Sequence, residues 1–393
     1  MSVSESENER SSLSILSAIV ALRSSFYNMR GVIWQPFVLS LGFSMKSLGG
    51  LESFLDFSRL LIQPIVGGAS DAQGRRRWLL LRDVLTVTIA ILSIFAGSTE
   101  ILLIIVLVSS FEGAIQNIWS ALVAESVKPD RIGYIFSILH TSATAAGLVA
   151  TLLSGYIAEI YGYRSVFIVS TFLAIMSLFL MIFRLPETKQ SAEVPKFRLK
   201  EAFNTLLQTL KPPRHLWGFY VAMSVDLFAF NIGWRLVSGM LTSGYGYTPQ
   251  MLGWMSATLT GTMFLSQLVL SRYIDKIGYV RCLASSQILA VIYLGMLVYS
   301  KQFEVVLAAQ IVMGLAAALW GPAENAWIAK NVNPEERARS MASYSSLRTL
   351  ASFPAPFIGG LLFDMYGLDI PLLVNIVLAI IDTGLILWLI KDK

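Results

Sequence analysis

The stretch GGASDAQGRRR occupies residues 67–77 and lies between two long apolar segments. Its frame, Asp-x-x-Gly-x-x-Arg, begins at Asp71 and ends at Arg77. The same frame returns in the second half of the chain, again between two apolar segments, as Asp275-Lys276-Ile277-Gly278-Tyr279-Val280-Arg281. A motif that recurs at the same place in each half indicates an internal duplication.

Two further pairs of segments stand at nearly the same offset. Residues 154–162 (SGYIAEIYG) resemble residues 359–367 (GGLLFDMYG), and residues 127–130 (VKPD) resemble residues 332–335 (VNPE). The chain is therefore predicted to consist of two halves repeated in parallel. Membrane transporters with alternating access are commonly built in this way.

The composition indicates a membrane protein. The chain is 55% hydrophobic and 14% charged, with a mean hydropathy of +0.64. A soluble domain carries about 25% charged residues. Most of the surface is therefore expected to face lipid.

Apolar stretches long enough to cross a bilayer recur along the whole chain, without the alternation of a β-barrel. We predict an all-α integral membrane protein with twelve transmembrane helices in two six-helix bundles. The bundles are expected at 1–184 and 215–393, with 185–214 as a cytoplasmic linker. The predicted helices are 15–42, 47–70, 78–98, 101–126, 132–160, 164–184, 215–243, 249–272, 280–300, 303–330, 337–364 and 370–390.

The net charge of +5 follows from topology and does not indicate nucleic-acid binding. If both termini are cytoplasmic, most lysines and arginines, among them Arg82, fall on the cytoplasmic side. Only Lys46, Arg164 and Lys301 fall on the opposite side. This asymmetry fixes the orientation by the positive-inside rule. We expect a multi-pass protein of the plasma membrane.

The order of six helices, a basic loop and six more helices resembles the major facilitator superfamily, and the resemblance spans essentially the whole chain. Residues 67–77 match that family's loop between helices 2 and 3, with a weaker second copy at 275–281. The resemblance implies a cytoplasmic gate in which a carboxylate at the membrane boundary pairs with arginines. Its residues here are Gly67, Asp71, Gly74, Arg75, Arg77, Asp275, Gly278 and Arg281.

Two departures from the family weaken a drug/proton antiporter interpretation. Ser109 stands where such antiporters often carry an arginine in helix 4. Their G-P-x-x-G-G string of helix 5 is also missing, and a similar string, APFIGG, appears at 355–360 in helix 11.

Ionisable residues inside the membrane are the candidates for the transport site. Each costs about 2.5–3.5 kcal/mol at mid-bilayer on insertion scales, so it normally faces a cavity or a partner. The resemblance implies that helices 1, 4, 7 and 10 line the central cavity. The candidates for the substrate and proton pathway are Arg30, Glu112, Asp226, Asn231, Trp234, Arg235, Trp320, Glu324 and Arg348.

Three details of these helices can be decided by structure. Asp226 and Arg235 lie on opposite faces of an ideal helix, so both line one cavity only if the helix unwinds near Gly233. Otherwise one of them is expected to pair with a neighbouring helix. Asp56 and Arg59 are expected to pair with each other. Asp382, on a helix that is peripheral in the family, is expected to be structural.

The leading hypothesis is a proton-coupled secondary transporter of a small organic molecule. Arginines would attract an anionic group, tryptophans an aromatic body, and Asp226 and Glu324 could carry a proton. The substrate is therefore either an amphipathic aromatic compound that is exported or an organic anion. A transporter-like sensor without transport is the alternative.

Enzymatic chemistry is not expected, because no nucleotide-binding loop or hydrolase motif occurs. Cys282 is the only cysteine, which excludes an intramolecular disulfide, and two histidines are too few for an obvious metal site. We expect no cofactor and no metal. The bilayer, a proton and a small-molecule substrate are the expected partners of a functional monomer.

Overall fold

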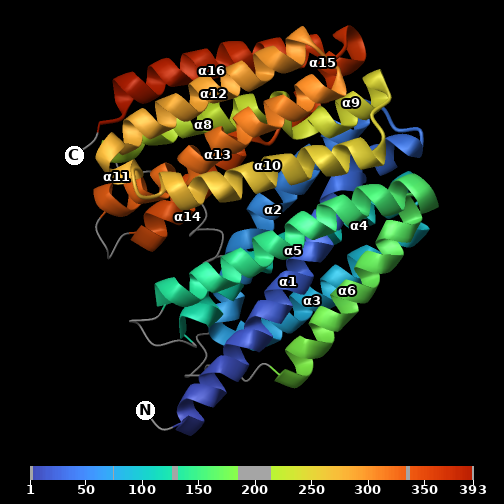
Figure 1. Ribbon diagram of the computed structural model, residues 1–393, viewed down its shortest axis with the longest axis vertical. Helices are drawn as coiled ribbons and strands as arrows, with labels where there is room; N and C mark the ends of the chain where they lie inside the picture. Colours follow the sequence, from blue (N-terminus) through green and yellow to red (C-terminus); the bar gives the residue numbers. More distant parts are fainter. Residues whose placement is uncertain (1–2, 74, 126–131, 185–213, 333–336, 392–393) are drawn as a thin grey trace. The chain divides into compact units, whose positions relative to one another are not determined.

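The computed structural model describes residues 3–73, 75–125, 132–184, 214–332 and 337–391, and the regular elements in these ranges are helices (Figure 1). Residues 185–213 of the predicted linker (185–214) and Gly74 of the first gate motif lie outside them. In the first half the helices follow the predicted segments, although α1 begins earlier than expected. They are α1 (Val3–Ser40), α2 (Met45–Gln73), α3 (Arg75–Phe95), α4 (Thr99–Glu125), α5 (Ile132–Tyr161) and α6 (Tyr163–Arg184).

Two predicted helices of the second half are interrupted. The segment 215–243 becomes α8 (Trp217–Ile232), a 3-10 turn η3 (Trp234–Leu236) and α9 (Val237–Tyr245). The segment 337–364 becomes α14 (Arg337–Ser352) and α15 (Ala355–Tyr366), because Pro354 lacks the N–H that an uninterrupted helix needs. The other elements are η2 (Arg214–Leu216), α10 (Pro249–Leu270), α11 (Ile274–Ile277), α12 (Tyr279–Tyr299), α13 (Phe303–Asn331) and α16 (Asp369–Leu389).

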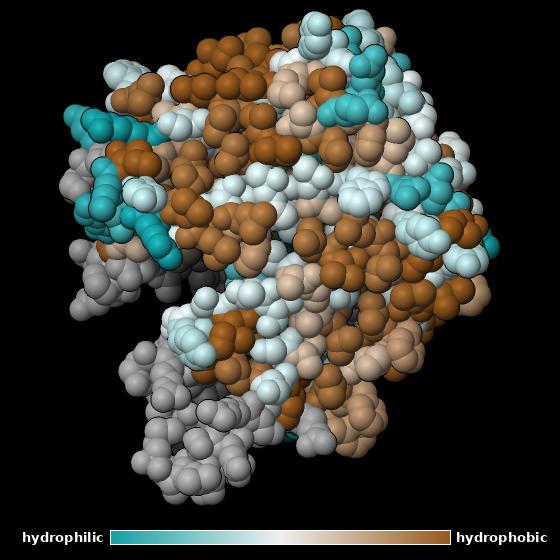
Figure 2. Space-filling view, viewed as in Figure 1, coloured by the Kyte–Doolittle hydropathy of each residue, from teal (hydrophilic) through white to brown (hydrophobic). Residues whose placement is uncertain are grey.

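Seven helices among the described residues are long and apolar enough to cross a membrane by length and composition, namely α3, α4, α5, α6, α12, α13 and α16. Large apolar side chains on them are exposed, for example Phe172 and Phe183 on α6 and Trp388 on α16. In Figure 2 hydrophobic side chains cover the face over α12 and α16, and hydrophilic ones gather near the helix ends. Lipid is the solvent that such a surface requires.

The described residues form two compact units. The first contains those of Met1–Trp34 and Leu61–Phe203, and in it α3 packs against α4 and α6. The second contains those of Gln35–Leu60 and Asn204–Lys393. In it α12 packs against α13 and α16, and α8 packs against α14, α15 and α16. Phe219 of α8 stacks on Trp327 of α13 with 4.1 Å between the ring centroids, which ties two helices of this core together.

Residues 35–60, from α1 and α2, pack within the second unit because glycines allow the backbones to touch. A Cβ on Gly49 would lie 2.2 Å from the carbonyl oxygen of Pro356, and one on Gly360 would lie 2.1 Å from that of Met45. The Asp364 carboxylate accepts from the backbone N–H groups of Met45 at 3.2 Å and Lys46 at 2.9 Å. It thereby satisfies free donors at the start of α2.

We predict that Gly359→Ala destabilises the protein, because the new Cβ would lie 2.0 Å from the carbonyl oxygen of Ile232 in α8. Overpacking of this kind costs about 1–3 kcal/mol. The midpoint of thermal unfolding in detergent should fall. Gly295→Ala in α12 is the matched control, because its Cβ meets no atom within 4 Å and the helix gains propensity. Equal midpoints for the two variants would contradict the close packing of α8 and α15.

Candidate functional site

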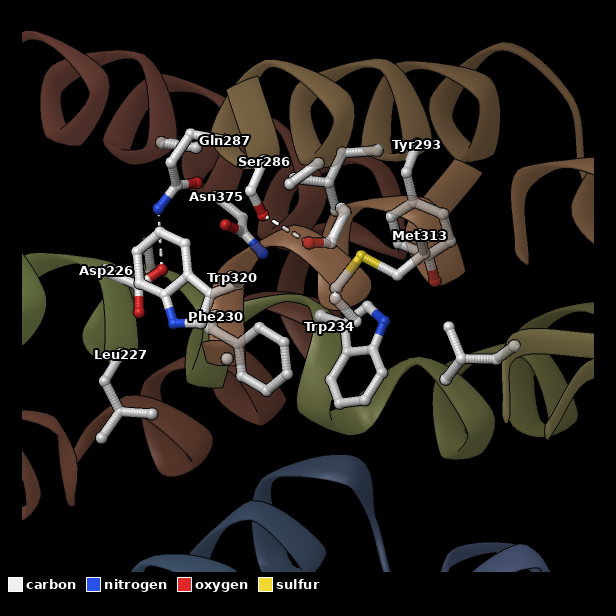
Figure 3. A pocket seen from close by; sticks show the side chains of 18 of the residues that line it. Asp226, Leu227, Phe230, Trp234, Ser286, Gln287, Tyr293, Met313, Trp320 and Asn375 are labelled. Atoms are coloured by element: carbon white, nitrogen blue, oxygen red, sulfur yellow. Dashed lines mark hydrogen bonds between the residues drawn. The ribbon is translucent and has the colours of Figure 1, made fainter. Parts of the chain in front are cut away.

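A cavity of about 350 Å³ lies inside the second unit (Figure 3). Sites for small molecules usually measure about 300–1,000 Å³. Most of its wall is apolar or aromatic and comes from α8, η3, α10, α12 and α13. These residues include Leu227, Phe230, Trp234, Leu259, Met263, Tyr293, Leu294, Met313 and Trp320.

Polar groups are few in this cavity and come from α8, α12, α14 and α16: they include Asp226, Ser286, Gln287, Arg348 and Asn375. In Figure 3 the Gln287 amide points at the Asp226 carboxylate. The Gln287 Nε2 donates to Asp226 Oδ1 at 2.7 Å. An apolar wall with a few convergent polar groups is the arrangement expected of a ligand site.

Arg348 holds the polar end of the cavity together. Its Nη2 donates to Asp226 Oδ2 at 3.0 Å, and its Nη1 donates to Glu324 Oε1 and, at 2.6 Å, to the Tyr344 hydroxyl. The Tyr344 hydroxyl in turn donates to Glu324. One guanidinium thus bridges carboxylates from α8 and α13, a geometry in which charge-assisted bonds are strong.

Asp382 extends this network to α16. The Gln287 Nε2 donates to Asp382 Oδ2 at 2.7 Å as well as to Asp226. We call Asp226, Gln287, Glu324, Tyr344, Arg348 and Asp382 the C-terminal cluster. It contains three carboxyl groups and one guanidinium. Its charge is therefore negative unless protons or a bound cation compensate it.

The helix unwinds near Gly233, between Asp226 and Arg235, but the two residues do not line one cavity, because Arg235 pairs with the neighbouring helix α2. A Cβ on Gly233 would lie 2.8 Å from Nδ2 of Asn375 in α16, so glycine permits the close approach there. The two charged residues nevertheless serve different places. Asp226 lines the cavity, whereas Arg235 reaches the carboxylates of α2.

Arg235 is held by two carboxylates. Its Nη2 lies 2.8 Å from Glu52 Oε2, and its Nη1 lies 2.5 Å from Asp56 Oδ2. Both oxygens of Asp56 accept from Arg235, so the expected pairing of Asp56 with Arg59 is wrong. Gln35 of α1 also binds this segment, through the backbone carbonyl of Arg235 and the N–H of Gly239.

The first unit contains a separate network of buried charges. Arg23 binds Asp83 with two hydrogen bonds of 3.0 and 2.8 Å. Arg82 Nε donates to Glu112 Oε1 at 2.7 Å, and Tyr27 donates to the same carboxylate. Arg82 is only 4% exposed, so its assignment to the charges that set topology is wrong: the Glu112 carboxylate stabilises it inside the bundle.

The remaining candidates occupy varied places. Arg30 lies over the Trp34 ring at 4.3 Å, a cation–π contact, and Asn231 is buried in α8. In the gate motifs, Gly67 lies in α2, Arg75 begins α3 and Arg77 is exposed, while the side chain of Asp71 lies outside the described part. In the second copy the Asp275 carboxylate accepts from the Tyr279 hydroxyl at 2.8 Å. Gly278 has a φ of +96°, and Arg281 is exposed.

Sequence reasoning missed several members of these networks. Gln287 and Tyr344 are not ionised at neutral pH and so gave no charge signal. Arg82 and Asp83 lie on α3, which is not one of the helices that the resemblance assigns to the central cavity. Asp382 was expected to be structural, but it belongs to the polar network beside the cavity. An aspartate in the middle of an otherwise apolar helix was the available signal.

The sequence pattern of the Major Facilitator Superfamily matches residues 13–243 and 227–393. The chain is 25% identical over 318 residues to the multi-drug resistance efflux pump PmrA of Streptococcus pneumoniae, covering 79% of this chain and 77% of that protein. It is 21% identical over 345 residues to the multidrug resistance protein MdtG of Escherichia coli, covering 85% and 79%.

Solved structures share the fold at lower identity. The human organic anion transporter MFSD10 (TETRAN) superposes with a TM-score of 0.70 at 17% identity, covering 96% of this chain and 99% of that one. The nucleoside transporter NupG (D323A mutant) superposes with a TM-score of 0.77 at 13% identity, covering 97% and 100%. The expected fold class is confirmed.

We predict that Arg235→Ala destabilises the protein, because the buried carboxylates of Glu52 and Asp56 would both lose the guanidinium that binds them. Breaking a buried pair in this way costs about 3–5 kcal/mol. The midpoint of thermal unfolding should fall, and the triple variant with Glu52→Gln and Asp56→Asn should recover most of the loss. Lys301→Ala serves as a control, since its partner Asp369 is 50% exposed. A triple variant no more stable than the single one would contradict this account.

Proposed function

The chain belongs to the Major Facilitator Superfamily, and from this membership we propose that it is a proton-coupled exporter of amphipathic compounds that combine an aromatic body with a positively charged or basic nitrogen. Members of this family are secondary transporters of small molecules, embedded in the membrane by several helices. The proposal goes beyond this membership by naming the substrate, the direction of transport and the coupling ion. The observation that carries it is the cavity of the second unit.

The wall of the cavity suits an aromatic body. Phe230 and Trp234 lie with their ring centroids 4.2 Å apart, and Tyr293 and Trp320 line the same space. Flat aromatic ligands gain stacking energy from such rings in addition to the burial of apolar area. Met263 and Met313 are flexible side chains that adapt to ligands of different shape.

The charge of the cavity favours a cation over an anion. Arg348 is already bound by Asp226 and Glu324, and Arg235 by Glu52 and Asp56. An anionic substrate would have to displace a carboxylate to reach either guanidinium. A cation, in contrast, would add a positive charge where three carboxyl groups share one guanidinium. The attraction between these opposite charges stabilises the bound cation. The organic-anion alternative is therefore the weaker one.

The same excess of carboxyl groups supports proton coupling. A proton and a cationic substrate both neutralise the C-terminal cluster, so binding of one disfavours binding of the other. If the protein exchanges a proton for the cationic substrate across the membrane, the proton gradient drives export of the substrate. The name of the relative PmrA, an efflux pump, agrees with this direction.

The remaining features of the proposal follow the sequence pattern. The protein lies in the plasma membrane with both termini in the cytoplasm, and it acts as a monomer whose bundles are 1–184 and 215–393. Asp71 with Arg75 and Arg77, and Asp275 with Arg281, contribute to a cytoplasmic gate. Support comes from the asymmetry of the basic loops and from a cavity formed within one chain.

We predict that Trp320→Ala weakens transport of ethidium, an aromatic cation, in proteoliposomes with an imposed pH gradient. Loss of stacking on one ring costs about 0.5–1.5 kcal/mol, so the KM should rise roughly two- to tenfold. Trp388→Ala on α16 is the matched control, because this tryptophan is 76% exposed and lies outside the cavity. Equal effects of the two substitutions, or preferential transport of carboxyfluorescein over ethidium, would contradict the proposed site or substrate.

We predict that Asp226→Asn reduces the affinity for ethidium, measured by fluorescence titration of the purified protein. A bond to a charged group contributes about 1.5–3 kcal/mol, so the Kd should rise at least tenfold. Asp369→Asn, half-exposed at the start of α16 and outside the cavity, should leave the Kd unchanged. An unchanged Kd in the Asp226 variant would place the cation elsewhere.

A further inference from the structure

Asp382 lies in the middle of α16 and is fully buried. Its Oδ2 accepts one hydrogen bond, from the neutral amide of Gln287 at 2.7 Å. Within the described ranges its Oδ1 has no hydrogen-bond partner. This carboxyl therefore has one bond where an ionised carboxylate could accept about four.

An ionised carboxylate in this position would be poorly compensated. Arg348, the guanidinium of the cluster, binds the carboxylates of Asp226 and Glu324. Burying a charge without a cation or several donors costs much more than holding it as a neutral acid. The surroundings thus require that Asp382 carry a proton in this conformation.

Asp226 differs from Asp382 because a guanidinium binds it, although Gln287 is a neighbour of both carboxyls. It accepts from Arg348 at 3.0 Å and from Gln287 at 2.7 Å, and both bonds stabilise its ionised form. The two N–H groups of the Gln287 amide can serve the two carboxyls at once. Asp226 is thus suited to a positive ligand, and Asp382 to a proton.

Among the described residues, the charged side chains that act on Asp382 are Asp226 and Arg348. α12 contributes the neutral Gln287 and α8 contributes Asp226. Arg348 of α14 and Glu324 of α13 lie beyond Asp226 and bind each other. On α15, Asp364 is engaged with the N–H groups of Met45 and Lys46.

We propose that Asp382 is a proton-binding site behind the substrate cavity, coupled through Gln287 to the cation site at Asp226. The proposal rests on the proposed function, because a cation bound at Asp226 is what expels the proton. The positive ligand favours the ionised form of Asp382, and the proton leaves its carboxyl oxygen for water. The remaining carboxylate then accepts a stronger, charge-assisted bond from Gln287. By reciprocity, protonation of Asp382 weakens cation binding.

The test measures proton release and ethidium binding on the same purified protein. Ethidium is permanently charged, so any proton released comes from the protein. The wild type should release about one proton per bound dye, and its Kd should fall up to about tenfold per pH unit as the pH rises. Asp382→Asn should bind ethidium with a Kd that no longer depends on pH and should release almost no proton. Asp369→Asn, at the exposed start of the same helix, should behave as the wild type.

Infrared difference spectroscopy of a pH titration tests the protonated state without any substrate. The band of a protonated carboxyl group should be present in the wild type and in Asp369→Asn and missing in Asp382→Asn. Gln287→Leu, a second variant, should retain the band but lose most of the proton release. Proton release by Asp382→Asn equal to that of the wild type overturns the proposal. Failure of the wild type to bind ethidium overturns the proposed function instead, and the infrared band then still decides whether Asp382 holds a proton.

Discussion

The bond of Arg348 to both Asp226 and Glu324 is the interaction on which the second unit depends. An arginine at this depth cannot lose its proton, and lipid cannot solvate it, so the fold must supply anions around it. The carboxylates come from α8 and α13 while the guanidinium comes from α14. The three helices are thereby tied together beside the cavity.

Two glycines, Gly233 and Gly359, allow the helices to place these buried charges beside their partners. Helix α8 must stop after Asp226 has entered the cavity, so that Arg235 can turn toward Glu52 and Asp56. The close approach of Gly233 to Asn375 makes room for this break, and Gly359 brings α15 onto the backbone of Ile232 at the end of α8. Backbone contact at small residues replaces the hydrophobic effect, which gives little association energy between helices in lipid.

The fold class could be predicted from composition and periodicity, because each membrane crossing requires a long apolar run. The opposite faces of Asp226 and Arg235 left two outcomes open, an unwound helix or a pair with a neighbouring helix, and the structure has both a break near Gly233 and a pair of Arg235 with α2. The partners of the buried charges could not be predicted from the sequence. Asp56 has Arg59 one turn away in sequence but binds Arg235 from a distant segment. Arg82, which the sequence assigns to the cytoplasmic charges, is buried against Glu112. Pairing between helices depends on packing angles that a single sequence does not encode in any local pattern.

The identity of residue 287 explains how one cluster can bind both a proton and a cation. A lysine or arginine between Asp226 and Asp382 would keep both carboxyls ionised and leave no proton to exchange. A leucine would leave Asp382 without its donor and remove the side chain that links it to Asp226. The glutamine amide donates to each carboxyl and adds no charge, so the net charge of the pair is free to change when a ligand arrives. A neutral donor between two buried acids is therefore the arrangement that couples them without fixing their protonation.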